Sequence, residues 1–170
     1  EGHVPGAVNI IEDGKFETWL GSIVGPEEKY YLIAESEKCM ESVIRRAAKI
    51  GYEKNLLGAL LNPSYGTKIH SGINVDGFKA YTDNFTIVDV RVESEVRANS
   101  YFDNAINIPL HELRERVNEV PSDKPIVVHC EGGYRSATGS SIIEKAFPEA
   151  VAYDLSLLIT NMAASSSIHP

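Results

Sequence analysis

The sequence predicts an α/β fold built from two related repeats, the first of them incomplete. Two observations lead to this fold class. Apolar runs of strand length alternate along the chain with segments of helical pattern. The chain also contains an internal duplication, because the segments that begin near residues 31 and 126 follow the same order of patterns without a gap.

The first half contains one strand and one helix with clear sequence signals. Residues 29–34 are an apolar and aromatic run that is typical of a strand. A helical pattern over residues 38–49 ends at Gly51, a residue that favours a helix C-cap. We expect this half to cover residues 1–62, and residues 63–79, which contain proline and glycine, to form a linker.

The second half, expected over residues 80–170, begins with a strand that the first half lacks. Residues 85–91 form an apolar run with polar residues at its end, which predicts a buried strand. The expected elements after it are short helices over 93–98 and 111–120, a strand over 125–129 and a helix over 136–146.

The duplication aligns residues 7–10 with 105–108, and residues 31–35 with 126–130. Nothing equivalent to the strand at 85–91 precedes Gly2. We therefore expect the chain to be a fragment of a longer polypeptide or to lack upstream residues. The sheet of the first repeat should then have an open strand position for a partner, a tail or a neighbour. The alternative is that the repeat is simply truncated and packs against the second.

Composition and charge exclude several classes of function. The 170 residues include 24 acidic and 16 basic ones, a net charge of −8, so the chain lacks the basic face that nucleic-acid binding needs. No apolar run approaches about 18 residues and no secretory leader pattern opens the sequence, so we expect a cytoplasmic protein without membrane association. Two distant cysteines and five scattered histidines predict no metal site, and we expect no cofactor.

The most informative segment is residues 127–137, where an apolar run ends in Cys130 and a glycine-rich loop leads into a helix. A cysteine between a buried strand and a helix N-terminus lies among backbone N–H groups at the positive end of the helix dipole. This position favours the thiolate, which is the nucleophilic form. Gly132 and Gly133 allow successive amides to converge on one point, and Arg135 adds a permanent charge. We therefore predict that Cys130 is a nucleophile.

The second half resembles the rhodanese (sulfurtransferase) family. Three motifs agree in order and spacing: the strand residues 88–91, the segment 105–110 and the loop from Cys130 to Ser136. The resemblance covers about residues 80–160. It implies an α/β domain with a mainly parallel central sheet flanked by helices, and a Cys130 that carries a transferable sulfur as a persulfide.

The remaining polar residues of this half have expected roles around Cys130. Arg135 binds either the anionic end of the sulfur donor or carboxylates that brace the loop, and both roles remain open. Asp89 and Arg91 are expected to support the loop, whereas His129 lies on the opposite face of its strand from Cys130. The expected substrate-binding loop consists of Glu131, Gly132, Gly133, Tyr134 and Ser136.

The first half resembles a rhodanese repeat without its nucleophile. Glu35 stands at the cysteine position and Met40 stands where the second half has Arg135. A carboxylate cannot carry a persulfide, so we predict that this repeat is inactive. Residues 2–19 also resemble the first rhodanese repeat of fusions with a metallo-β-lactamase-fold persulfide dioxygenase. That resemblance implies an upstream domain, which would hold the iron of such fusions.

The loop favours sulfur transfer over its rivals. Four residues separate Cys130 from Arg135, and the related phosphatases of this fold have one residue more, which makes a wider cradle for phosphate. We predict a sulfurtransferase that moves sulfane sulfur from thiosulfate or a thiol persulfide, such as glutathione persulfide, to a thiol, sulfite or cyanide by double displacement. Glu131 replaces the basic residue of many active members and disfavours dianionic thiosulfate. The alternatives are a non-catalytic interaction or regulatory module of a larger sulfur-metabolising protein, and a Cys-dependent phosphatase or arsenate reductase.

Overall fold

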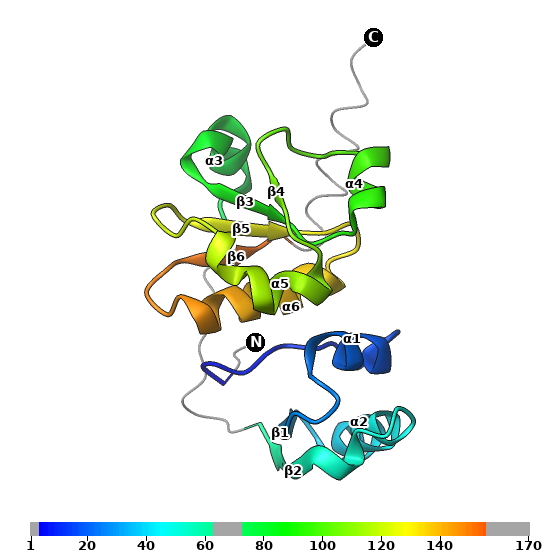
Figure 1. Cartoon of the computed structure of the whole chain (residues 1–170). Helices are drawn as coiled ribbons and strands as arrows, with labels where there is room; N and C mark the ends of the chain where they lie inside the picture. The colour runs from blue at the N-terminus through cyan, green and yellow to red at the C-terminus, as the bar shows by residue number, and fades with distance from the viewer. Residues whose placement is uncertain (1–3, 63–72, 156–170) are drawn as a thin grey trace. The chain divides into compact units, whose positions relative to one another are not determined.

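The structure, a computed structural model, describes residues 4–62 and 73–155, which fold as two compact units (Figure 1). Of the described residues, 4–5 and 10–62 belong to the first unit, and 6–9 and 73–155 belong to the second. Each unit has its own sheet and its own buried core. They are therefore described separately.

Two boundaries differ from those expected from the sequence. Residues 63–72 of the expected linker lie outside the described residues, but its last part forms the helix α3 (Val75–Ala80). Phe78 of this helix is fully buried in the core of the second unit, which therefore begins before residue 80. Residues 6–9, which the duplication assigns to the first repeat, belong to the second unit, where the Asn9 N–H donates to Ser141 Oγ at 2.9 Å.

The first unit is a two-stranded parallel sheet with helices packed on it. Strands β1 and β2 pair in parallel, with Tyr31 opposite Gly58 and Ala34 opposite Leu61. The elements are α1 (Phe16–Ile23), β1 (Tyr30–Ala34), α2 (Glu37–Ala48), the 3₁₀ helix η1 (Glu53–Asn55) and β2 (Leu56–Leu61).

The residues at the two ends of helix α2 explain where the helix begins and ends. Its N-cap, Ser36, accepts a hydrogen bond from the Cys39 N–H at 3.2 Å, and Gly51, with a φ of 74°, follows its C-terminus. Val43 and Ala47 are four residues apart, so they lie on one face of the helix and enter the core of the unit. Helix packing thus covers one face of the small sheet.

The second unit is a four-stranded sheet in the order β4-β3-β5-β6, with every neighbouring pair parallel. Its helices are α3, α4 (Glu93–Ala98), α5 (Leu110–Arg116) and α6 (Tyr134–Ala146), with the 3₁₀ helices η2 (Thr82–Asn84) and η3 (Val117–Glu119). Its strands are β3 (Thr86–Asp89), β4 (Ile106–Asn107), β5 (Ile126–His129) and β6 (Ala152–Asp154). The elements expected over 85–91, 93–98, 125–129 and 136–146 are confirmed within a few residues.

Both faces of this sheet are covered, which explains why its central strands are apolar without alternation. Helices α5 and α6 lie on one face and α3 lies on the other (Figure 1). On the α6 face, a Cβ at Gly139 would lie 3.1 Å from Cγ1 of both Val128 and Val90. On the α3 face, Phe78 packs with Ile87 and Val127. All residues of β3 and β5 are buried as a result.

Candidate active site

The Cys130 loop lies at the carboxyl end of a central strand. Strand β5 ends at His129 and helix α6 begins at Tyr134, so residues 130–133 form the connection. Ligands of parallel α/β sheets bind outside the carboxyl ends of the strands, where such loops gather. The fold thus presents Cys130 at the edge of the sheet where chemistry is expected.

The sulfur of Cys130 is held by the loop that follows it. Gly133 donates its backbone N–H to Sγ at 3.1 Å, and Sγ lies 3.5 Å from Ser136 Oγ, to which the thiol donates. The Ser136 hydroxyl in turn donates to the Gly133 carbonyl at 3.0 Å. Cys130 is only 1% exposed. The structure therefore brings together Cys130, Gly133 and Ser136 of the expected loop.

The start of α6 leaves its first amides available to the sulfur. Its N-cap is Gly133, which has a φ of 83° and no side chain to bond the first turn. A residue with a Cβ would be strained in this left-handed conformation. The unpaired amides of the first turn carry the positive end of the helix dipole, so an anionic sulfur is stabilised there.

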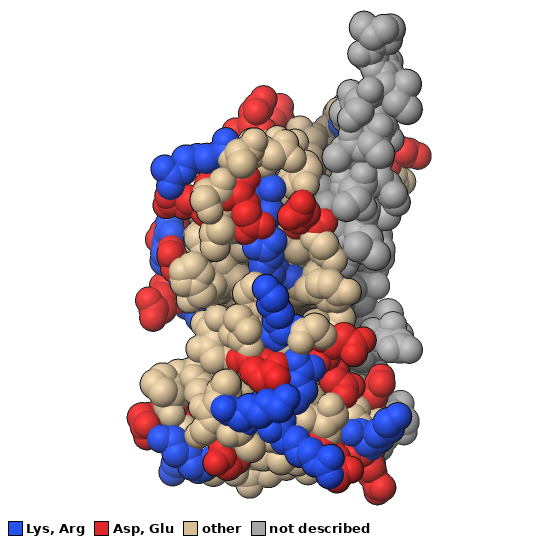
Figure 2. Space-filling view, turned by 90° about the vertical axis from the view of Figure 1, so that its right-hand side faces the viewer, with Lys and Arg blue, Asp and Glu red and all other residues tan. Residues whose placement is uncertain are grey.

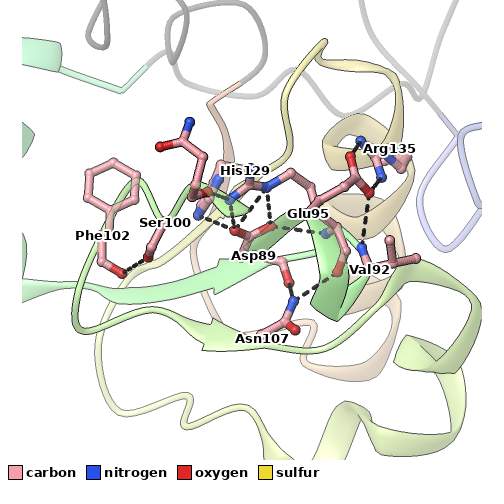
Figure 3. Close-up of polar contacts among 10 residues, drawn as sticks. Asp89, Val92, Glu95, Ser100, Phe102, Asn107, His129 and Arg135 are labelled. Carbon is pink, nitrogen blue, oxygen red and sulfur yellow. Dashed lines mark hydrogen bonds and ion pairs between the residues drawn. The ribbon is translucent and has the colours of Figure 1, made fainter. Parts of the chain in front are cut away.

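The hydrogen bonds of the Arg135 guanidinium go to a carboxylate, while its charge also lies close enough to Cys130 to interact with it electrostatically. Its Nη1 and Nη2 donate to the two carboxylate oxygens of Glu95 at 2.6 and 2.8 Å (Figure 3). This forked hydrogen bond lowers the pKa of Glu95 and raises the pKa of Arg135. Of the two roles left open by the sequence, this geometry corresponds to bracing the loop.

Glu95 is a residue of the site that sequence reasoning missed. It lies in the first turn of α4, and its Oε2 also accepts the Val92 N–H at 3.2 Å. The carboxylate therefore joins the segment after β3 to the first turn of α6. The sequence showed only that a glutamate follows strand β3 closely. Glu93 has the same position relative to the strand but pairs with Arg97 on the surface, so the sequence could not distinguish the two glutamates.

Asp89 and Arg91 form a buried ion pair at the end of β3. Arg91 donates through Nε and Nη2 to the Asp89 carboxylate, with the shortest distance 2.6 Å, and Nη2 also donates to the Asn99 carbonyl. Asn107 of β4 donates its Nδ2 to the carbonyls of Asp89 and Arg91 at 2.9 and 2.8 Å (Figure 3). These contacts fix the carboxyl ends of β3 and β4 beside the loop.

His129 is fully buried on the side of β5 away from the sulfur. Its ring packs edge-on against the rings of Tyr101 and Phe102, and Asp89 Oδ2 lies 3.6 Å from Nε2. Neither ring nitrogen has a hydrogen-bond partner in the described part of the chain. Burial lowers the pKa of His129 to about 4, so the imidazole is neutral near pH 7. It faces away from the Cys130 sulfur, as expected from strand alternation.

The other loop residues face solvent. Glu131 is exposed, Tyr134 is 55% exposed and Gly132 is half-buried. The second cysteine, Cys39, is half-buried in the first unit, where burial and a hydrogen bond with Glu12 raise the pKa of its thiol to about 11. The two cysteines therefore occupy different chemical environments.

Residues 4–62 and 73–155 contain no group of three or more His, Cys, Asp or Glu side chains placed to hold a metal ion. None of the helices in these same ranges is long and apolar enough to cross a membrane. On the face drawn in Figure 2, Lys and Arg side chains lie next to Asp and Glu side chains. Surface pairs of this kind include Arg97–Glu93 and Arg116–Glu112.

The family model of the Rhodanese-like domain matches residues 75–157. The protein YqhL of Bacillus subtilis, described as uncharacterized, is 30% identical over 81 residues, which cover 48% of this chain and 64% of that protein. A sulfurtransferase of Allochromatium vinosum is 33% identical over 57 residues, covering 34% of this chain and 52% of that protein. A rhodanese-related protein from Thermoplasma volcanium has a solved structure with 27% identity and a TM-score of 0.47, covering 59% of this chain and 96% of that one.

The chain thus spans between half and two thirds of the length of these two curated relatives. The similarity lies in the second unit and includes the Cys130 loop. One of the two curated relatives bears the name sulfurtransferase.

Proposed function

We propose that this protein is a rhodanese-type sulfurtransferase in which Cys130 carries sulfane sulfur as a persulfide. The observation that carries the proposal is the Gly133 N–H directed at Cys130 Sγ at 3.1 Å, at the carboxyl end of β5 and the start of α6. The match of residues 75–157 to the rhodanese-like domain supports the same chemistry.

The first half-reaction loads sulfur onto the enzyme. The Cys130 thiol loses its proton to solvent, and the thiolate attacks the outer sulfur of the donor. A new S–S bond forms at Sγ while the bond between the outer sulfur and the rest of the donor breaks. The leaving group departs with that electron pair, as sulfite from thiosulfate or as a thiolate from a thiol persulfide.

The second half-reaction returns the enzyme to its starting state. A thiol, sulfite or cyanide attacks the outer sulfur, and the Cys130 thiolate leaves with the electron pair of the S–S bond. No electrons are gained or lost overall, so the reaction needs no cofactor. The fixed amide of Gly133 and the start of α6 stabilise the negative charge on sulfur in both steps without reorganisation.

Phosphate or arsenate chemistry has less support from the site. Such a reaction needs a guanidinium to bind the transferred group. Arg135 is the loop cation, and both ends of its fork are occupied by Glu95. Transfer of a single sulfur atom that is bound by backbone amides does not need a free guanidinium.

The charges near Cys130 favour a donor without an anionic group directly bonded to its transferable sulfur. Arg135 is neutralised by Glu95 and Arg91 by Asp89, and Glu131 beside the cysteine is exposed. Dianionic thiosulfate is disfavoured by this balance more than a thiol persulfide is. Glu131→Arg should therefore increase the loading rate with thiosulfate more than with glutathione persulfide, and equal increases with both donors would contradict this assignment.

The same proposal extends to the whole chain. The first unit, over residues 1–62 in the sequence expectation, is taken as an inactive rhodanese-like repeat, and an upstream metallo-β-lactamase-fold domain as a neighbour in the full polypeptide. The internal duplication supports the first point, and the resemblance of residues 2–19 supports the second. We place the activity in the cytoplasm, with small sulfur compounds and without nucleic acid or membrane as partners.

Sulfur loading can be measured directly on the protein. The 170-residue chain is mixed with thiosulfate, and separately with glutathione persulfide, and the mass of Cys130-containing peptides is determined. We expect a gain of one sulfur atom on Cys130 and release of thiocyanate when cyanide is added. Cys39→Ser is the matched control, since its thiol lies in the other unit, and it should leave both signals intact.

Cys130→Ser should abolish both signals. Absence of sulfur on Cys130 with either donor would contradict the enzyme proposal and favour a non-catalytic interaction or regulatory module.

A further inference from the structure

The carboxylate of Glu95 binds two segments that border the Cys130 loop. It lies in the first turn of α4, where Oε2 accepts the Val92 N–H at 3.2 Å. Its two oxygens also accept the guanidinium of Arg135, in the first turn of α6, at 2.6 and 2.8 Å (Figure 3). Arg135 is the only basic residue between Cys130 and Ser136 in the sequence. One carboxylate therefore binds the single cation of the loop.

The charge of Arg135 acts both on Glu95 and on Cys130. The hydrogen bonds with Glu95 are the largest cause of the raised pKa of the guanidinium, and the electrostatic interaction with Cys130 contributes to it as well. The same hydrogen bonds lower the pKa of the Glu95 carboxyl, so this group is ionised near pH 7. Its negative charge therefore offsets the positive charge of Arg135 at the sulfur.

Two ion pairs lie at this end of the sheet, and they differ in exposure. The side chains of Arg91 and Asp89 are 3% and 2% exposed, and Arg91 also donates to the Asn99 carbonyl. The side chains of Arg135 and Glu95 are 16% and 31% exposed. A molecule that approaches from solvent can reach the second pair but not the first. Of these two guanidinium groups, Arg135 is the one that a sulfur donor can meet.

With Arg135 paired, the remaining charge of the loop is negative. Glu131, directly after Cys130, is exposed to solvent. Thiosulfate has a sulfonate group bonded to its outer sulfur, and this group meets the Glu131 charge without a free cation to offset it. A thiol persulfide has no such group on its outer sulfur. The fork between Glu95 and Arg135 thus disfavours one class of donor.

We propose that Glu95 is a positioning residue that determines the class of sulfur donor. By binding both Nη atoms of Arg135, it withholds the guanidinium from an anionic donor and leaves Cys130 to thiol persulfides. This inference rests on the proposed sulfur transfer through Cys130. Glu93, in the same turn of α4, has no such role, because it pairs with Arg97 of its own helix.

The first test compares the two donors in Glu95→Gln. The glutamine keeps the shape of the side chain and an oxygen that can accept the Val92 N–H, but it loses the charge and the second acceptor for the fork. We expect the ratio of kcat/KM for thiosulfate to that for glutathione persulfide to rise about tenfold. The change should appear mainly as a lower KM for thiosulfate, because the freed guanidinium attracts its sulfonate.

The second test probes the charge at Cys130 without sulfur transfer. Iodoacetate and iodoacetamide both alkylate a thiolate with loss of iodide, but only the first is an anion. The rates are followed by the mass of the Cys130-containing peptide, which separates this thiol from that of Cys39. The ratio of the iodoacetate rate to the iodoacetamide rate should also rise about tenfold in Glu95→Gln. A general change in the loop would alter both rates and leave their ratio constant.

Glu93→Gln is the matched control, because it removes the same charge from the same turn of α4 and leaves Arg135 paired. Both ratios should stay at the parent values. The double variant Glu95→Gln/Arg135→Gln should also return them to the parent values, because the freed guanidinium is then absent. Glu95→Asp, whose shorter side chain cannot hold the full fork, should give intermediate ratios and provides the same comparison if Glu95→Gln does not fold. Urea unfolding checks the fold of each variant.

Equal ratios in the parent and in Glu95→Gln, together with sulfur loading of the parent from glutathione persulfide, would overturn the role of Glu95 and leave the proposed function intact. An equal rise in Glu93→Gln would overturn this role as well. So would a rise that persists in the double variant, since the effect would then not act through Arg135. Absence of loading from either donor, with a raised alkylation ratio in Glu95→Gln alone, would contradict the proposed function and support control of the charge at Cys130 by Glu95.

Discussion

The two units contain the same strand–helix–strand order but connect the first strand to its helix differently. In the first unit, two residues lie between β1 and α2. In the second unit, four residues lie between β5 and α6, and they form the Cys130 loop. Both strand pairs are parallel. The same strand–helix–strand arrangement thus occurs with a short turn in the first unit and with a longer loop around the Cys130 sulfur in the second. The two units differ in the segment that connects the first strand to the helix.

The helix caps show the same contrast. Ser36 caps α2 with its hydroxyl, which accepts the Cys39 N–H. Gly133 caps α6 without a side chain, and its own N–H reaches the Cys130 sulfur. The first helix uses its free amides for its own stability, whereas the second leaves an amide for the candidate nucleophile.

Side-chain facing refines the comparison at the cysteine position. In β5, Val128 lies against Gly139 of α6, and Cys130 follows two residues later on the same side. In β1, Ala34 is buried and Glu35 is exposed. Judged by the face of the strand on which the side chain lies, the counterpart of Cys130 is Ala34. The ungapped sequence alignment instead gives Glu35, one residue later. Neither a methyl group nor a carboxylate can carry a persulfide.

Grafting a cysteine into the first unit tests this contrast with the largest expected effect. In a Cys130→Ser background, sulfur transfer should fall by at least about 10³-fold because the nucleophile is lost. Adding Glu35→Cys or Ala34→Cys should not restore it, because the two-residue connection leaves no loop amide to bind the sulfur. Thiocyanate release and the mass of the modified peptide measure the outcome. Transfer by either graft within about tenfold of the parent rate would show that the loop is dispensable.

The second-largest expected difference between the two units is the pH dependence of the free energy of unfolding, because His129 lies in the second unit. Burial lowers the pKa of His129 to about 4 from the model-peptide value of 6.5, so the unfolded chain binds a proton at a pH where the folded unit does not. The free energy of unfolding should be unaffected above about pH 7 and should fall by roughly 3 kcal/mol as the pH decreases from 6.5 to 4.

His129→Phe is the matching variant, since both ring nitrogens lack hydrogen-bond partners among the described residues and the ring lies between Tyr101 and Phe102. Urea unfolding followed by circular dichroism should show this pH-dependent loss in the parent and its absence in the variant. Equal slopes in both proteins would mean that His129 is charged or solvated in the folded state.

Local sequence signals were sufficient for part of this architecture. The apolar run before Asp89 and the loop glycines after Cys130 predicted β3 and the cysteine at a strand–helix junction, because both features depend on neighbouring residues. The partner of Arg135 could not be predicted in this way, since Glu95 lies 40 positions earlier and meets it only through tertiary packing. Helix α3 was missed for a related reason: six residues with a single buried side chain, Phe78, have no periodic pattern.

Gly133→Ala tests whether the left-handed cap is required by the sulfur loop. A Cβ at a φ of 83° should cost about 1–2 kcal/mol of stability and slow sulfur loading about tenfold, because the N–H that reaches Cys130 moves. Gly132→Ala is the control in the same loop, since its Cβ would meet only Tyr134 Cδ2 at 3.9 Å. Loading rates with both donors and urea unfolding provide the measurements. Equal losses in the two variants would assign the effect to the loop in general.

Ser36→Ala removes the side-chain cap of α2 in the first unit, as a counterpart to the change of the α6 cap in the second unit. It has the smallest expected effect. Loss of the hydroxyl that accepts the Cys39 N–H should lower the stability of α2 by about 1 kcal/mol, and Ser36→Gly should lower it less. Fluorescence of Trp19, which lies in α1 of the same unit, follows this change during urea unfolding. Sulfur loading on Cys130 should stay at the parent rate, because the capping hydroxyl serves only its own helix. A slower loading rate in Ser36→Ala would show that the first unit influences the Cys130 loop, and the division of stability and chemistry between the two connections would then be wrong.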